Sequence, residues 1–209
     1  MSDPRVVGLG EHNLDARLPT CLIALVLNQW DPVKLFERAA ARAAETLAHV
    51  RPEQLDGPTP CAAWSVQELI EHMVGSTDYL IDAAGAGATV RFAPATVEDY
   101  RSGVARVLDV LARPGVLQQS CRSPLDFEWS VADATAGTFM DNLVHTWDLA
   151  TASGQDSELD DELVAACVAM FLPDMPERGR AAGIVGPAVA VPRDASAQDR
   201  LLGAMGRQP

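Results

Sequence analysis

The chain is poor in basic residues, and this shortage excludes two kinds of partner. Only 16 of its 209 residues are Lys or Arg, against 29 that are Asp or Glu. The formal net charge is therefore −13 and the pI about 4.6. A surface with this charge repels phosphate backbones and anionic lipid headgroups. The composition predicts neither a nucleic-acid partner nor a membrane partner.

Long apolar runs are also missing. The longest one near the N-terminus, residues 22–27, is far shorter than the roughly 20 residues that a membrane-spanning helix needs. It follows a charged segment that lacks the layout of a signal peptide. We therefore expect a cytoplasmic protein.

Cysteine is scarce, and the common catalytic motifs are absent. The four cysteines, Cys21, Cys61, Cys121 and Cys167, form no CxxC pair, so we expect free thiols rather than a zinc ribbon or a redox pair. A GxSxG elbow, a P-loop, an HExxH pair and a glycosylation sequon are all lacking. The glycine-rich GAGATV has no third glycine and follows a predicted helix, which excludes a dinucleotide fingerprint.

The remaining composition is that of a globular domain, with 48% hydrophobic and 22% charged residues. A chain of this length can bury a core as one domain. Residues 1–29 show no sustained period, so we interpret them as an N-terminal extension. The domain itself is predicted to span residues 30–209.

Helix signals dominate this domain. Asp31 before Pro32 and the capping box of Ser65 with Glu68 mark two helix starts. Helices are predicted at residues 32–49, 66–84, 97–112, 131–153 and 159–171. The tail, residues 172–209, is rich in Pro, Gly and Ala and is expected to wrap over the helices, with a helical turn or two at residues 199–206. Residues 116–130 could hold an extended piece, but no partner strand is evident and no sheet is predicted. The fold class is all-α: a four-helix bundle with an extra helix and a wrapping C-terminal tail.

The stretch MDNLVHTWDLA, residues 140–150, carries a polar stripe. Asp141, His145 and Asp148 share one face of a helix that turns about 100° per residue. The opposite face is apolar and is expected to make the core contacts: Phe139, Met140, Leu143, Val144 and Trp147. Taken alone, the stripe is typical of a solvated face whose pairs stabilise the helix by about 0.2–0.5 kcal/mol each.

His72 offers a second interpretation. It lies at the edge of the apolar arc of the helix at residues 66–84, a position that points along a seam between helices. There it could meet Asp141 and His145, and two imidazoles with one carboxylate can bind a divalent ion. The alternative is a partly buried histidine hydrogen-bonded to a neighbouring turn, to Glu68 or to Glu71. The metal hypothesis requires the two imidazole rings to lie within about 8 Å of each other.

Two motifs and the tail carry a resemblance to a known family. TPCAAWSVQELIEHMVG (residues 59–75) and the later MDNLVHTWDLATASG resemble the DinB/YfiT-like metalloenzymes of actinobacteria, and within them the group related to the N-terminal domain of mycothiol-dependent maleylpyruvate isomerase. The tail VGPAVAVPRDASAQDRLLGAMGRQP is similar to that of the same group. The resemblance covers roughly residues 30–209.

This resemblance implies a metal site. His72, Asp141 and His145 match the positions that bind a divalent metal in the family, with zinc as the first expectation and nickel as the alternative. The isomerase has glutamate at the position of Asp141, so the carboxylate here reaches one methylene less far. Asp148 is expected either to orient an imidazole from outside the ligand set or to be a solvated carboxylate.

The implied function is a metal-dependent thiol transferase or isomerase, in which the ion lowers the pKa of a bound thiol or water. The resemblance implies mycothiol as the thiol and a small electrophile as the substrate. The separate C-terminal domain of the isomerase is lacking, so its specific reaction is not expected. The rivals are a non-catalytic metal-binding or sensory bundle and a plain interaction bundle. A second copy of the chain, forming a homodimer, is a candidate partner, and the sequence leaves the oligomeric state open.

Other motif residues have simpler expected roles. Trp64 and Trp147 are expected to pack rather than to react. Arg178 and Arg180 in the tail, with Arg200, are the candidates for binding an anionic cofactor or substrate.

Overall fold

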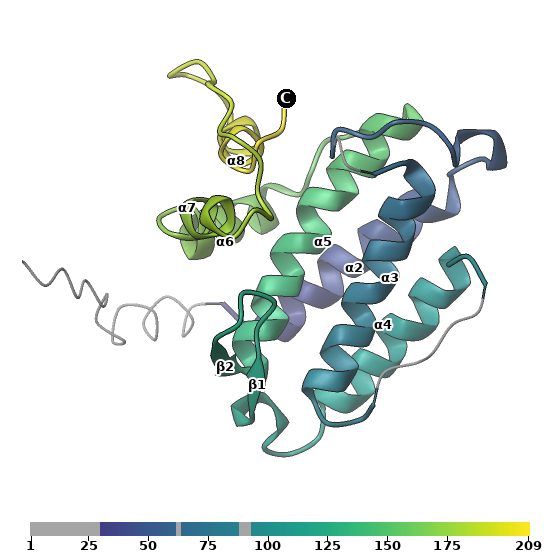
Figure 1. Ribbon diagram of the computed structural model, residues 1–209, viewed down its shortest axis with the longest axis vertical. Coiled ribbons are helices and arrows are strands. Elements are labelled where there is room, and N and C mark those ends of the chain that lie inside the picture. Colours follow the sequence, from purple (N-terminus) through teal and green to yellow (C-terminus); the bar gives the residue numbers. More distant parts are fainter. Residues whose placement is uncertain (1–29, 62–63, 88–92) are drawn as a thin grey trace, which may run out of the picture.

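The computed structural model describes residues 30–61, 64–87 and 93–209, and this part of the chain is mostly helical (Figure 1). The predicted N-terminal extension, residues 1–29, lies outside the described residues. Seven α-helices are present within them: α2 (Pro32–Ala48), α3 (Val66–Ala83), α4 (Val97–Leu111), α5 (Val131–Ser153), α6 (Asp161–Phe171), α7 (Met175–Ala181) and α8 (Ala197–Ala204). Single 3₁₀ turns lie at Pro52–Gln54 and Val116–Gln118. The mostly helical class predicted from the sequence is confirmed.

Side-chain caps explain where the main helices begin. The carboxylate of Asp31 accepts from the backbone N–H of Val33 at 3.0 Å, ahead of a proline in the first turn of α2. Capping boxes open the next three helices, and each satisfies backbone donors that the helix itself leaves free. The three pairs are Ser65 with Glu68, Thr96 with Asp99, and Ser130 with Asp133.

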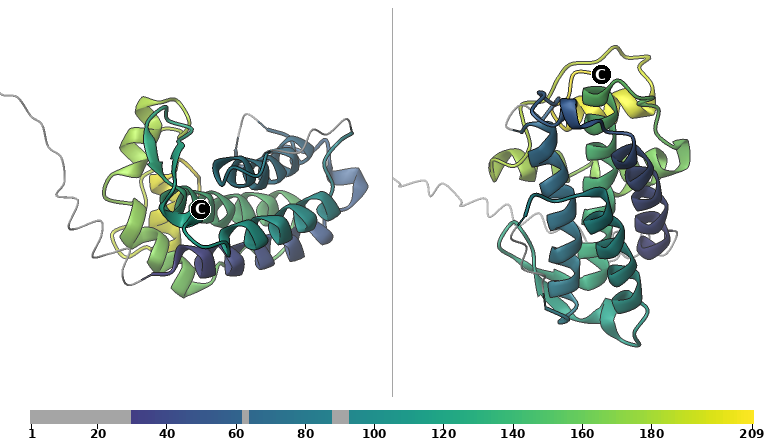
Figure 2. Two further views of the ribbon diagram at one scale, coloured as in Figure 1. Left: turned by 90° about the horizontal axis from the view of Figure 1, so that it is seen from below. Right: turned by 90° about the vertical axis from the view of Figure 1, so that its right-hand side faces the viewer.

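Helices α2 to α5 lie side by side and enclose the core (Figure 2). Helix α5 packs against α2 and α3, and α4 packs against the same two helices. Because α5 is also covered by the hairpin and by α6, most of its residues are buried around the whole circumference. A side chain on α5 therefore faces protein in almost any direction.

Residues 116–130 differ from the prediction. They form an antiparallel hairpin of β1 (Ser120–Arg122) and β2 (Glu128–Ser130), so the expectation that no sheet forms was wrong. The partner strand lies within the same segment, separated by a turn in which Asp126 has φ 67°. Ser123 Oγ accepts from the backbone N–H groups of Leu125 and Phe127 at 3.2 Å and holds this turn.

The C-terminal segment forms more helix than the sequence predicts. Helices α7 and α8 lie within the tail, and α8 packs on α6 beside α5 (Figures 1 and 2). Helix α8 ends in a Schellman motif, in which the N–H of Gly206 bonds to Gly203 and that of Arg207 to Leu202, at 3.1 and 2.8 Å. Gly206 has φ 81°, which a residue with a side chain rarely adopts. The chain after Gly206 is thereby turned back toward α5.

None of the described helices is both long and apolar enough to cross a membrane.

Candidate metal centre

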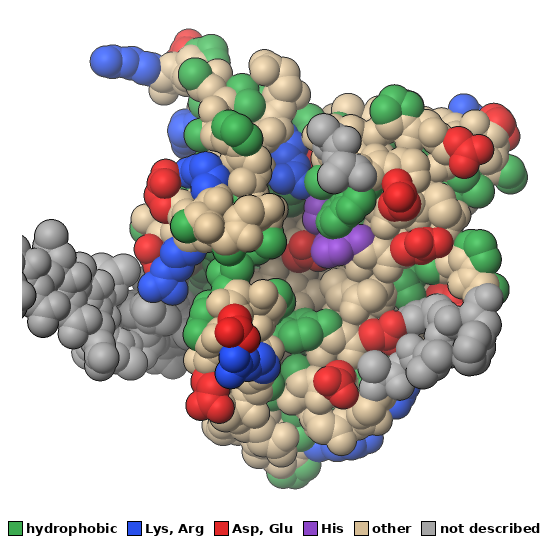
Figure 3. Space-filling model, in the orientation of Figure 1, with side chains coloured by type: hydrophobic (Ala, Val, Ile, Leu, Met, Phe, Trp, Pro, Cys, Tyr) green, Lys and Arg blue, Asp and Glu red, His purple; other side chains and the backbone are tan. Residues whose placement is uncertain are grey.

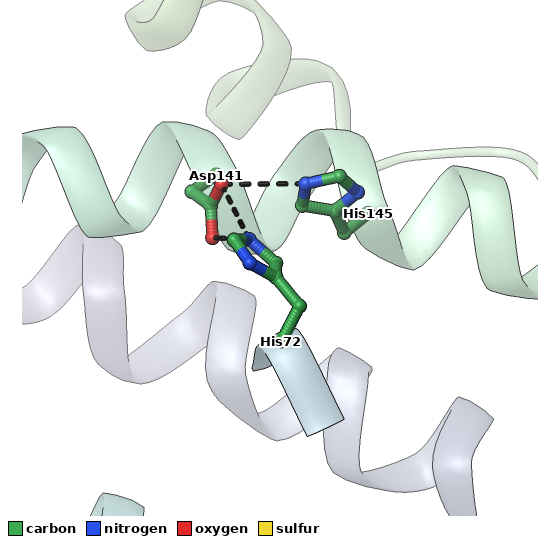
Figure 4. A group of neighbouring side chains, drawn as sticks. All are labelled: His72, Asp141 and His145. Atoms are coloured by element: carbon green, nitrogen blue, oxygen red, sulfur yellow. Dashed lines mark hydrogen bonds and ion pairs between the residues drawn. The ribbon is translucent and has the colours of Figure 1, made fainter. Parts of the chain in front are cut away.

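Two helices place three ligand groups at one point (Figure 4). Asp141 and His145 lie one turn apart on α5, and His72 reaches them from α3, which packs against α5. His72 Nε2 lies 3.1 Å from each carboxylate oxygen of Asp141, and His145 Nε2 lies 3.3 Å from Oδ1. The two imidazole centroids are 4.7 Å apart, so the distance that the metal hypothesis requires is met.

The donor set suits a divalent transition metal. One ligand atom from each of the three residues lies within 4.8 Å of the other two. Metal–ligand bonds near 2.0–2.1 Å in tetrahedral geometry place neighbouring ligand atoms about 3.3 Å apart. The two separations that involve Asp141, 3.1 and 3.3 Å, already have about this length. Two histidines with one carboxylate are a common zinc donor set.

The cluster is open on one side. The side chains of His72 and Asp141 are 33% and 27% exposed, whereas that of His145 is 8% exposed. Histidine side chains reach the surface in a recess on the face shown in Figure 3. A small molecule can therefore approach the cluster from solvent.

Asp148 lies behind His145, on the side away from this opening. Its Oδ2 is 2.9 Å from His145 Nδ1, and its side chain is fully buried. The interpretation of the stripe as a solvated face is therefore wrong, because α3 and the C-terminal segment cover that side of α5. An Nδ1–H donated to Asp148 leaves the lone pair of His145 on Nε2, which faces Asp141 and His72.

Arg207 is the residue that the sequence analysis missed. Its Nε and Nη2 donate to Oδ1 and Oδ2 of Asp148 at 3.1 and 2.7 Å, and it is itself buried. It lies just after the helical turns predicted at residues 199–206, so no helical period includes it. The one local sign is the glycine before it, which is typical of a helix C-terminus.

The predicted anion-binding arginines have other contacts. Arg178 is exposed and pairs with Asp174 at 2.8 Å, and Arg180 donates to Glu177 and to the carbonyl oxygen of Ala204. Both lie on α7, and no interaction joins them to the three-residue cluster in the described part of the chain. Their role toward an anion stays a prediction.

The charges of the cluster shift the pKa values of its members. Burial raises the pKa of Asp141, but the charges and hydrogen bonds of His145 and His72 outweigh it and hold that pKa well below its usual range. Burial likewise lowers the pKa of His145, yet Asp141 and Asp148 outweigh it and raise the value to about 9. Asp148 has a lowered pKa, since its bonds from His145 and Arg207 outweigh its burial. Without a metal, the cluster is thus a network of paired charges.

The ring of Trp64 packs beside the imidazole rings of His72 and His145. Its ring centroid lies 4.4 Å from that of His72, tilted by 30°, and 5.4 Å from that of His145. Its own backbone is held by a bond from its N–H to the carbonyl of Cys61 and by the hydroxyl of Thr59. Trp147 is buried in the core, as expected of a packing residue. Trp64 packs as well, but against the two imidazoles.

The fold and the cluster together define a class of protein: a mostly helical domain that carries two histidines and one aspartate at a single point. Comparison with known proteins gives the family. The model of the mycothiol maleylpyruvate isomerase N-terminal domain matches residues 36–115, a range that includes His72 and ends before α5. The chain belongs to this family, as the sequence resemblance indicates.

Two relatives match over most of their length. The uncharacterized proteins Rv0738 and MT0763 of Mycobacterium tuberculosis, strains H37Rv and CDC 1551, are each 33% identical over 183 residues. Each alignment covers 85% of this chain and 98% of the relative. No solved structure gives a significant match.

Proposed function

We propose that this protein binds a divalent metal ion through His72, Asp141 and His145 and uses it in the chemistry of a small thiol. The observation that carries the proposal is the convergence of these three side chains from two helices on one point with an open side. Zinc is the first expectation and nickel the alternative. Helices α2 to α5 are proposed to form the four-helix bundle of the DinB/YfiT-like class.

The number of ligands favours catalysis over a purely structural ion. In the described part of the chain the cluster holds three ligand groups, whereas a closed structural zinc site has four. A fourth position is thereby left for a small molecule that enters from the exposed side. A bound divalent ion would supply Lewis acidity there and lower the pKa of a thiol within its reach.

Residues around the cluster would orient the ligands and shape the surroundings of this fourth position. Asp148 orients His145 so that Nε2 faces the cluster, and Asp141 bridges the two imidazoles. Two neutral imidazoles and one carboxylate neutralise only half of a divalent charge, so an anionic thiolate would be favoured as the further ligand. Trp64 covers one side of His72 and would exclude water from part of the site.

Family membership supports the choice of thiol. The matching family is that of the mycothiol maleylpyruvate isomerase N-terminal domain, so we propose mycothiol as the cosubstrate and a small electrophile as the substrate of a transferase or isomerase reaction. A non-catalytic metal-binding bundle is the alternative, and it would show the same metal affinity without thiol chemistry.

Metal binding is tested by titration. Purified metal-free protein should bind about one equivalent of zinc, with a rise in melting temperature, and His72→Ala should abolish both. His49→Ala is the matched control, since this exposed histidine directly after α2 lies outside the cluster and bonds to the carbonyl oxygen of Glu45. Zinc binding that survives in His72→Ala and Asp141→Ala would contradict the proposed site.

Thiol chemistry is tested separately with the cobalt-substituted protein. Mycothiol added to it should produce a sulfur-to-cobalt charge-transfer band, because the thiolate would enter the ligand set. An alcohol analogue of the thiol should not produce the band. If metal binds and no thiol changes the spectrum, the non-catalytic alternative is favoured.

A further inference from the structure

Asp148 connects the cluster to the end of the chain. Its Oδ2 faces His145 Nδ1 at 2.9 Å and also accepts from Nη2 of Arg207 at 2.7 Å. Its Oδ1 accepts from Nε of the same guanidinium at 3.1 Å. Both oxygens of this fully buried carboxylate thus accept hydrogen bonds from an arginine 59 residues further along the chain.

The backbone around Arg207 is fixed as firmly as its side chain. The Schellman motif at the end of α8 bonds the N–H of Arg207 to the carbonyl of Leu202 at 2.8 Å. Its Nη1 donates to the carbonyl of Met205 at 2.8 Å, so all three side-chain nitrogens have partners. A guanidinium fixed in this way presents a rigid fork to Asp148.

Because the carboxylate of Asp148 is fully buried, it needs a partner such as the guanidinium of Arg207. A carboxylate removed from water is costly unless a cation and hydrogen bonds compensate it. Arg207 provides both, and its two bonds set the plane of the carboxylate. That plane determines where Oδ2 points, and Oδ2 is the atom that accepts from His145 Nδ1.

We propose that Arg207 is a positioning residue for the metal centre: through Asp148 it fixes the orientation of His145, so that the C-terminal segment is part of the metal site. The inference rests on the proposed role of His145 as a ligand. Within the described residues, the hydrogen bonds of the Arg207 side chain go to Asp148 and Met205 and to none of the three ligand residues. It acts through one carboxylate and one imidazole.

The alternative is that Arg207 only fastens the tail to α5. A fastening role would change the stability of the fold but not the geometry of His145. The two roles therefore differ in metal affinity and in the state of the Nδ1 proton, both of which can be measured in folded protein.

The test uses Arg207→Gln in the full-length protein, with Arg207→Lys as a milder variant that keeps the charge but cannot bond both oxygens side by side. Arg193→Gln is the matched control, because Arg193 lies in the same C-terminal segment and is exposed. Zinc affinity is measured by competition with a chelator. Proton NMR of the metal-free protein follows the hydrogen-bonded Nδ1–H of His145.

We expect Arg207→Gln to weaken zinc binding about 10–100-fold, the range typical of residues that orient a ligand. Arg207→Lys should lie between this variant and the wild type, and Arg193→Gln should match the wild type. In an Asp148→Asn background, Arg207→Gln should cause no further loss, because the residue through which it acts is already altered. The Nδ1–H signal should disappear or broaden in Arg207→Gln.

Unchanged affinity and an unchanged Nδ1–H signal in folded Arg207→Gln would overturn the inference, as would a full additional loss in the Asp148→Asn background. If the wild type itself binds no metal, the proposed function fails. The NMR signal then still decides whether Arg207 orients His145, because it is read without any ion.

Discussion

At the scale of single residues, Asp141 has the central position in the cluster. Its carboxylate oxygens lie within 3.3 Å of a ring nitrogen of each imidazole. Its negative charge also holds both imidazoles in place when no ion is bound. The carboxylate therefore has two functions: it organises the cluster without metal, and it would neutralise charge when metal is present.

Removal of this carboxylate should abolish metal binding. We expect Asp141→Ala to lower zinc affinity by more than roughly 100-fold, beyond the effect of altering a residue that only orients a ligand. Asp141→Glu should retain binding, since the isomerase of the family has glutamate at this position. Competition titration with a chelator measures both, and equal affinity of Asp141→Ala and wild type would remove Asp141 from the ligand set.

The metal-free protein should lose stability as the pH rises. The pKa of His145 is raised from 6.5 to about 9 in the folded state, so its protonated form stabilises the fold fully below pH 6.5 and this contribution is lost as the pH passes 9. The loss should be on the order of 2–3 kcal/mol in the free energy of unfolding. Urea unfolding with chelator present, compared with His145→Gln, measures it. The same pH dependence in both proteins between pH 6.5 and 9 would show that His145 contributes nothing.

At the scale of elements, close contact between α3 and α4 helps to place His72. Gly103 of α4 lies against Thr77 of α3, and a Cβ at Gly103 would lie 2.2 Å from the hydroxyl oxygen of Thr77. The hydroxyl itself is committed to the carbonyl of Val74 at 2.8 Å. The two helices can approach closely only because position 103 has no side chain.

A methyl group at this contact should force the helices apart. We expect Gly103→Ala to destabilise the fold by about 1–3 kcal/mol, as is typical of overpacking. Gly75→Ala is the matched control: Gly75 is exposed on α3, its added Cβ would meet nothing within 4 Å, and alanine should stabilise that helix by up to about 1 kcal/mol. Chemical denaturation distinguishes the two, and equal effects would disprove the packing argument.

At the scale of the whole molecule, the C-terminal helices share the core of α2 to α5. Cys167 on α6 is fully buried within that core, and burial raises the pKa of its thiol well above the ordinary value. The buried pair of Arg207 and Asp148 forms a second connection between the tail and α5. From these contacts we expect helices α2 to α8 to unfold as one unit.

Thiol labelling tests this cooperativity. Cys167 should react with a thiol reagent only when the whole domain unfolds, because its side chain is inaccessible and its thiolate is disfavoured. The denaturant dependence of its labelling should match the loss of helical circular dichroism. Cys121, which is partly exposed, is the internal control and should react in the native state. Labelling of Cys167 well before helix loss would show that α6 to α8 open separately.

Much of the local structure follows from the sequence. Asp31 and Ser65 mark two helix starts because capping acts over three or four residues, and both cap the helices observed. The hairpin at residues 120–130 was missed because its strands are only three residues each, too short for an alternating pattern to show.

Part of the candidate site also follows from the sequence, and the rest depends on the tertiary structure. Helical spacing alone places Asp141, His145 and Asp148 on one face of α5 and His72 at the edge of an apolar arc, and the family motifs support their grouping as ligands. Only the tertiary structure decides that this face is covered and that His72 meets Asp141. It also decides that Arg207 pairs with Asp148, which lies 59 residues earlier in the chain. Burial and long-range pairing depend on how whole helices pack, whereas caps and helix faces depend on neighbours within one or two turns.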